Sequence, residues 1–167
     1  VVVSGYTFDS PQITESISDA GRRGAIVKVI LDDSYATTKR NTLECCIKML
    51  ENGVRIYFAS GARIQEEYGA IGKKVRDARG LQHSKTVRVG HWWLTGSCNW
   101  STSSRCNLEL DTLTELRSDR TARDKEKIIF ASAVRQERED IQNCLAILKH
   151  KDNEKAEKKC AERRSVS

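Results

Sequence analysis

Apolar residues in the first third of the chain occur in blocks with two different periods. Residues 1–8 are rich in β-branched and aromatic side chains and predict a strand. Residues 25–33 form a nearly continuous apolar run, which is typical of a strand buried on both faces. Residues 54–59 predict a third strand, and between these runs the apolar positions repeat with the spacing of a helix. The pattern therefore predicts a β-α-β-α-β order.

Two helices are predicted between these strands. The first begins at Pro11 after a Ser10 cap and ends near Gly24, which follows two arginines. The second covers about residues 41–51 and stops at the Asn52-Gly53 pair. Successive strands joined by helices form right-handed crossovers with the helices packed on the sheet. We expect an α/β fold in which a mixed sheet is flanked by helices.

The middle of the chain breaks this pattern. Residues 61–80 contain four glycines and no clean period, so we expect a long, basic loop. Residues 81–89 and 91–96 predict two strands joined by a tight turn at Val89-Gly90, and residues 107–116 resemble a last strand.

The C-terminal part of the chain is highly charged. Residues 117–167 hold 14 Lys and Arg against 10 Asp and Glu. Four apolar residues lie on one helical face and predict a long helix that docks on the domain: Val134, Ile141, Leu145 and Leu148. This apolar stripe ends at about Lys149. We therefore expect one globular domain over residues 1–150 and a charged tail, helical or disordered, over residues 151–167.

The net charge indicates which partners the protein binds, and the cysteines indicate the redox state of its compartment. The net charge of +6 and the pI of about 9.1 favour polyanionic partners, either nucleic acid or acidic lipid headgroups. The six cysteines form no CxxC pair and do not cluster with the three histidines, so we expect no zinc site and reduced thiols in an intracellular, reducing compartment. The sequence starts at Val1 and not at Met. We expect it to be a fragment, which leaves open any upstream targeting or anchoring segment.

The segment from residue 83 to residue 99 carries the candidate chemistry. It opens with His83 and Lys85 and closes with Ser97 and Asn99. On a strand, a spacing of two puts both side chains of a pair on one face, so an imidazole and an ammonium could reach the same phosphate. An imidazole can attack phosphorus and later leave, and nearby donors stabilise charge on the phosphoryl oxygens. The pattern indicates a phosphate-handling site.

The combination of "HSK", "TGSCNW" and "NLEL" in this β-α-β setting resembles the phospholipase D superfamily over roughly residues 1–115. It most resembles the single-motif branch, which includes bacterial endonucleases and the mitochondrial cardiolipin hydrolase/Zucchini-type nucleases. The resemblance implies a phospholipase D-like fold. It also implies a phosphodiesterase that acts on nucleic acid or phospholipid and uses neither a metal nor another cofactor.

The resemblance also implies a role for each residue of the site. His83 matches the nucleophile that forms a phosphohistidine, and Lys85 matches the lysine that binds the phosphoryl oxygens. Ser97 and Asn99 match the hydroxyl and amide that complete the phosphate pocket. Glu109 matches a carboxylate that contacts the other ring nitrogen of the histidine. One chain supplies one such histidine, so the resemblance implies a C2 homodimer with a shared site, in which the second histidine is the acid.

One part of the family motif is missing. The family has an Asp five positions after the lysine, and Gly90 occupies that position here. The family Asp is thought to brace the strands and not to react, so we expect activity to be retained. The alternative is a catalytically weak module that binds nucleic acid or lipid.

The residues before His83 are basic. Residues 63–88 carry seven Lys and Arg against three acids. Four of these cations are candidates for binding a polyanionic backbone: Lys73, Lys74, Arg76 and Arg79. The alternative is a solvated surface loop. The basic charge and the lack of an obvious apolar interfacial helix favour a nuclease over a lipase, and a mitochondrial location would rest on family analogy alone.

Overall fold

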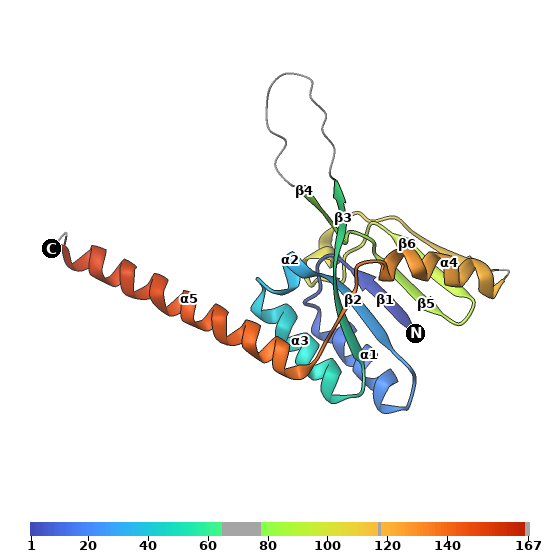
Figure 1. Ribbon diagram of the computed structural model, residues 1–167, viewed down its shortest axis with the longest axis horizontal. Helices are drawn as coiled ribbons and strands as arrows, with labels where there is room; N and C mark the ends of the chain where they lie inside the picture. The colour runs from blue at the N-terminus through green and yellow to red at the C-terminus, as the bar shows by residue number, and fades with distance from the viewer. Residues whose placement is uncertain (65–77, 117, 166–167) are drawn as a thin grey trace, which may run out of the picture.

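The computed structural model describes residues 1–64, 78–116 and 118–165 (Figure 1). Within this part of the chain, one eight-stranded mixed sheet has the order β4-β3-β2-β1-β5-β6-β7, and β8 pairs with β3. Strands β1, β2 and β3 are parallel to one another, and the other pairings are antiparallel. The α/β fold with a mixed sheet flanked by helices is therefore confirmed.

The strands are β1 Val2–Gly5, β2 Lys28–Asp32, β3 Arg55–Ile64, β4 Ala78–Leu81, β5 Thr86–Val89, β6 Trp92–Gly96, β7 Asp111–Glu115 and β8 Val134–Gln136. The helices are α1 Pro11–Arg22, α2 Asp33–Ala36, α3 Arg40–Glu51, α4 Asp119–Phe130 and α5 Arg138–Ser165, with a short 3-10 helix at Ser103–Cys106. The first half of the chain follows the sequence pattern closely. The Ser10 hydroxyl caps α1 by accepting from the Ile13 N–H at 3.4 Å.

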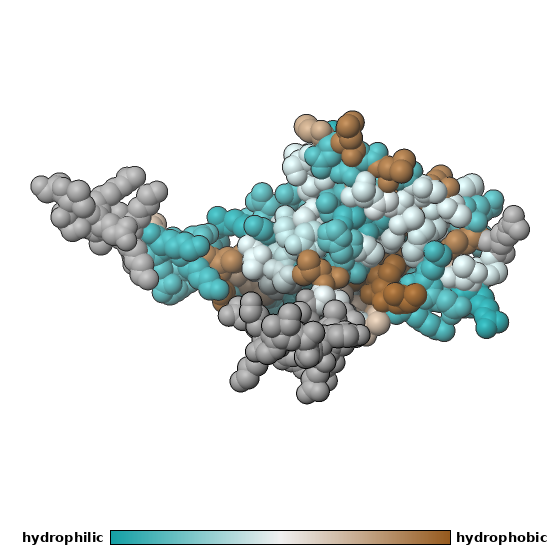
Figure 2. All heavy atoms as spheres, turned by 90° about the horizontal axis from the view of Figure 1, so that it is seen from above, coloured by the Kyte–Doolittle hydropathy of each residue, from teal (hydrophilic) through white to brown (hydrophobic). Residues whose placement is uncertain are grey.

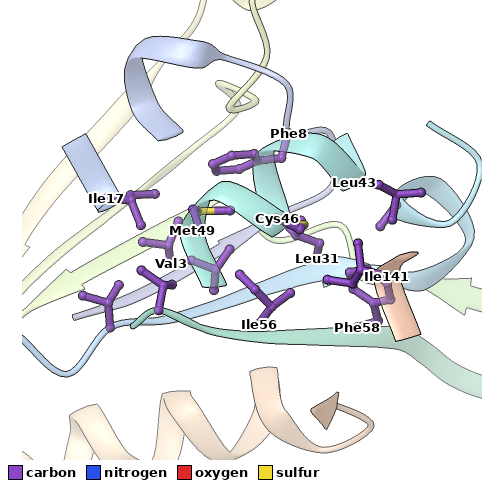
Figure 3. Close-up of a cluster of buried hydrophobic side chains, with 14 residues drawn as sticks. Val3, Phe8, Ile17, Leu31, Leu43, Cys46, Met49, Ile56, Phe58 and Ile141 are labelled. Atoms are coloured by element: carbon purple, nitrogen blue, oxygen red, sulfur yellow. The ribbon is translucent and has the colours of Figure 1, made fainter. Parts of the chain in front are cut away.

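Alternate residues of the central strands enter two different hydrophobic cores. Val3 and its neighbours face α1 and α3 in a core that is shown in Figure 3, whereas Val2 faces α4. Successive side chains of a strand point to opposite faces, which produces this division. The first core contains Val3, Phe8, Ile17, Leu31, Leu43, Met49, Ile56 and Phe58. The second contains Val2, Ile30, Ala59, Trp93, Leu116, Ala122 and Ile129.

The second half of the chain differs from the prediction in two places. Residues 61–64 and 78–80 are not loop but continue β3 and β4, which pair antiparallel. Helix α4 was not predicted, because few apolar residues of this charged segment are buried: Ala122 and Ile129 lie in the second core. Two apolar residues one helical heptad apart give only a weak periodic pattern.

Helix α5 runs without interruption through the predicted docked helix and into the predicted tail, for which a helix was one of the two alternatives. Val134 does not belong to it, since this residue lies in β8 opposite Phe58. Ile141 is fully buried and anchors the beginning of the helix in the first core. The helix then projects from the domain (Figure 1), and the part of it that Figure 2 colours beyond the domain is mostly hydrophilic. Among the described helices, none is both long and apolar enough to span a bilayer.

Candidate active site

The His-x-Lys segment crosses the carboxyl ends of the parallel strands. β4 ends at Leu81 beside β3, and β5 begins at Thr86 beside β1, so residues 82–85 pass the end of β2 on the way. We expected His83 and Lys85 on one continuous strand, which is wrong, because they lie in the connection between two strands. The carboxyl edge of parallel strands is a common position for ligand sites in α/β folds.

His83 and Lys85 nevertheless come together. The Lys85 Nζ lies 3.1 Å from His83 Nδ1 and 3.2 Å from Nε2, and it donates a hydrogen bond of 2.9 Å to the His83 carbonyl. His83 is exposed, whereas Lys85 is only 6% exposed. Burial lowers the pKa of the Lys85 ammonium, and the Glu109 carboxylate opposes this shift. The site thus presents an accessible imidazole beside a sheltered cation.

Two tyrosines that were not predicted as site residues stack in series, because Tyr6 packs on His83 and Tyr35 packs on Tyr6. The ring centroid of Tyr6 lies 4.8 Å from that of His83, and the Tyr35 ring lies 5.2 Å from Tyr6. The Lys85 ammonium lies 5.7 Å from the centre of the Tyr6 ring. A partial signal was present in the sequence, because Tyr6 lies in the last part of the strand predicted over residues 1–8, near the end of a parallel strand where sites form.

Ser97 and Glu109 form the next part of the site. The Ser97 hydroxyl donates to one Glu109 oxygen and accepts from the Leu110 N–H at 3.1 Å. The Asn107 amide donates to the other Glu109 oxygen at 3.0 Å. Hydrogen bonds from Ser97 and Asn107, together with the charge of Lys85, lower the pKa of Glu109. The structure therefore joins this carboxylate to Ser97 by a hydrogen bond and to Lys85 by an electrostatic interaction through space, and a bond from Glu109 to the His83 ring is not among its contacts in the described residues.

Asn99 belongs to a turn that docks on the segment after β1. Its side-chain oxygen accepts from the Thr7 N–H at 3.5 Å. The neighbouring Trp100 indole donates to the Ser4 carbonyl at 2.6 Å, and its ring occupies the space that a Cβ at Gly5 would need. Asn99 is thus bonded to Thr7, and the preceding residue, Tyr6, packs on His83. Asn99 therefore lies on the same side of the molecule as the imidazole. Ser97 and Asn99 lie in the loop that follows β6, beyond the strand.

Gly90 occupies the turn between β5 and β6. Val89 pairs with Trp92, so Gly90 and His91 form the turn. Gly90 has a φ of 57°, in the left-handed region that favours glycine. A Cβ added there would meet nothing within 4 Å, so an aspartate would point into open space and would not brace the strands.

We therefore expect Gly90→Asp not to increase phosphodiester turnover. The left-handed backbone should make this variant less stable by about 1 kcal/mol. Thermal unfolding and a diesterase assay on the same preparations would measure both effects. Gly90→Asn is the matched control, because it has a similar backbone cost without the charge. A clear gain of turnover in the aspartate variant alone would contradict the expectation.

The basic segment before His83 can be placed only in part. Lys73, Lys74 and Arg76 lie outside the described residues. Arg79 lies in β4, four positions before His83, and its side chain is outside the description. Binding of a polyanion by these four residues stays a prediction.

The structure places the His83–Lys85 pair at the carboxyl edge of the parallel strands and Ser97 and Asn99 in the loop after β6, and the use of these four side chains to handle a phosphate stays a prediction. The chain belongs to the phospholipase D superfamily, because residues 1–131 match the family model described as "Cardiolipin synthase, PLD-like domain". This confirms the resemblance found in the sequence, and the chain contains a single His-x-Lys motif of this kind. Membership in the superfamily supports a hydrolase of the phosphodiesterase type in general.

Two solved structures share the fold. Nuc from Salmonella typhimurium, a phospholipase D family member, has a TM-score of 0.60 and 16% sequence identity, over 80% of this chain and 79% of that chain. NucT from Helicobacter pylori has a TM-score of 0.62 and 17% identity, with the same coverage of 80% and 79%. A comparison with curated proteins gives no match in sequence.

Proposed function

We propose that this chain is a metal-independent phosphodiesterase that works through a phosphohistidine on His83. The observation that carries the proposal is the position of the Lys85 Nζ, 3.1 and 3.2 Å from the two ring nitrogens of His83. A phosphoryl group bound to either nitrogen would lie beside this sheltered ammonium. Such a preorganised positive charge stabilises the charge that develops on phosphoryl oxygens in the transition state.

The proposed reaction has two displacements. In the first, a ring nitrogen of His83 attacks phosphorus, the N–P bond forms, and the P–O bond to the leaving group breaks while a general acid protonates the leaving oxygen. In the second, water attacks phosphorus, the N–P bond breaks, and a proton of the water returns to the former acid. Lys85 and Asn99 would donate to the phosphoryl oxygens. The single proton of the Ser97 hydroxyl is donated to Glu109 in the structure, so Ser97 would donate to a phosphoryl oxygen after turning away from that carboxylate. The negative charge of Glu109 would favour the charged form of Lys85.

We further propose that the general acid is His83 of a second copy of the chain. The other two histidines, His91 and His150, lie in the β5–β6 turn and on α5, so neither belongs to the His-x-Lys segment. Leu108 and Leu110 flank Glu109 and are 104% and 80% exposed, which leaves an apolar surface next to the site. A C2 homodimer that covers these leucines would place two copies of the site at its axis.

Nucleic acid is the proposed substrate, and an anionic phospholipid is the second candidate. The net charge of +6 favours a long polyanion, and Tyr6, which lies between His83 and Tyr35, offers an aromatic face for a base. Gly90 in place of the motif Asp is the observation that favours the other function, a weakly catalytic module that binds nucleic acid or lipid.

The substrate and the metal requirement can be tested together. We expect the protein to cleave single-stranded DNA or RNA in EDTA, to leave cardiolipin vesicles intact, and to sediment as a dimer at micromolar concentration. Loss of cleavage in EDTA with recovery on adding a divalent cation would contradict the metal-independent reaction. Binding without cleavage would support the module, and full activity of a monomer would contradict the shared site.

A further inference from the structure

The His-x-Lys segment is anchored through its even-numbered residues. The Gln82 N–H donates to Asp32 Oδ2 at 2.8 Å. The Ser84 hydroxyl lies 2.8 Å from the Ser4 hydroxyl, and the Gln82 side-chain amide donates to Ser84 at 2.6 Å. Thr86, the next even-numbered residue, is also bonded to Ser4, at 2.8 Å. In an extended segment alternate side chains point to opposite sides, so these anchors leave the side chains of the odd-numbered residues available for chemistry.

Asp32, the residue that accepts the hydrogen bond from Gln82, is buried. It is the last residue of β2 and is 1% exposed. Its Oδ1 caps α2 by accepting from the Tyr35 N–H at 2.9 Å. The same oxygen also accepts from the Ser34 hydroxyl. Its Oδ2 accepts from Gln82. One carboxylate therefore joins the start of α2 to the residue directly before His83.

The same carboxylate also closes a ring of contacts around the imidazole. Asp32 holds the backbone of Tyr35, the Tyr35 ring packs on Tyr6, and Tyr6 packs on His83. Gln82 connects His83 back to Asp32 through the chain. The imidazole is thus held from two directions by contacts that share one buried acid. An aspartate in place of Gly90 would contribute nothing to this arrangement, because residue 90 lies in the turn at the far end of β5.

We infer that Asp32 is a positioning residue that holds the His83 ring in line for attack on phosphorus, with Ser4 anchoring the other end of the segment. The kinetic part of this inference rests on the proposed phosphodiesterase function. Asp32 touches neither the substrate nor the reacting atoms, and it acts through Gln82 and Tyr35.

Asp32→Asn separates this role from a general role in folding. Asparagine caps helices about as well as aspartate, so its oxygen can keep the bond to the Tyr35 N–H. Its NH₂ group would then face the Gln82 N–H, and two donors cannot bond to each other. Asp33→Asn is the matched control, because it removes the same charge one residue later, from a side chain that makes no hydrogen bond to residues 82–85 in the described part of the chain.

We expect Asp32→Asn to lower kcat about 10- to 100-fold with KM nearly unchanged, as expected for a small misplacement of a reacting group. The thermal midpoint should be a few degrees lower than that of Asp33→Asn, about what one unsatisfied buried donor costs, and the Gln82 amide should exchange its hydrogen faster than in the control. Ser4→Ala, which removes the bonds to Ser84 and Thr86, should also lower kcat and leave KM nearly unchanged.

Equal kcat values and equal Gln82 exchange in Asp32→Asn and Asp33→Asn would overturn the inference. A fall in kcat that follows the thermal midpoint in all three variants would also overturn it, because this would indicate a purely structural role. If the wild type shows no turnover, the proposed function fails. The NMR signals of the Gln82 amide and the His83 imidazole then decide the inference: a change in Asp32→Asn alone supports it, and no difference from Asp33→Asn overturns it.

Discussion

Replacing His83 by asparagine is expected to lower phosphodiester turnover about 10⁴-fold or more, because the exchange removes both the nucleophile and the general acid of a shared dimeric site. Asparagine can still form hydrogen bonds but cannot form a covalent bond to phosphorus that later breaks. Since His83 is exposed, its loss should have little effect on stability. Single-turnover cleavage of a labelled single-stranded oligonucleotide in EDTA would measure the loss.

The matched control for this variant is His91→Asn, which makes the same exchange in the turn at the other end of β5. It should cleave at the wild-type rate. A labelled protein–phosphate adduct that is stable in base and labile in acid should form with the wild type and with His91→Asn, and not with His83→Asn. Residual cleavage by His83→Asn at the rate of the control would refute the phosphohistidine mechanism.

Replacing Lys85 by methionine is expected to lower turnover about 10²- to 10³-fold, the usual effect of removing one group that stabilises transition-state charge. The fold should be at least as stable as the wild type at neutral pH. Burial lowers the pKa of Lys85, so the charged form reduces the free energy of unfolding while the pH is below the folded-state pKa. Methionine has a similar shape and carries no charge.

The sign of this effect can be checked by its pH dependence. As the pH rises through the folded-state pKa of Lys85, the wild type loses the cost of the buried charge, so the difference in unfolding free energy between wild type and Lys85→Met should become smaller. Lys127→Met, which removes one exposed charge on α4, should show neither the loss of turnover nor this trend. Wild-type turnover in Lys85→Met would show that the ammonium does not stabilise the transition state.

Local features of the chain were sufficient to predict much of the fold. The Ser10-Pro11 pair marks the start of α1, because a hydroxyl cap and a fixed proline φ favour a helix from the adjacent residues alone. The apolar run that contains β2 is buried on both faces, as its composition indicated. Helix α4 escaped prediction because its two core residues are too few to define a period.

The candidate site was also predicted only in part. The chemical identities of His83 and Lys85 were recognised from their spacing and from the family resemblance, although they lie in a connection and not on a strand. The environment of these residues was not predicted. Tyr6 and Asp32 were assigned to strand ends and had no known partner until the segment after β4 was placed over them.

The sequence by itself determined the order of the early elements, the caps of α1 and the chemical groups at the site, because each depends on residues within a few positions of one another. Only the tertiary structure decided which carboxylate meets which donor. Asp32 and Gln82 are 50 positions apart, and their bond exists because β4 and β5 pair with different strands of one sheet. Ser97 and Glu109 are 12 positions apart and meet because the chain returns to the sheet edge as β7. Contacts of this kind depend on how the whole sheet is ordered, and no short stretch of the chain contains that information.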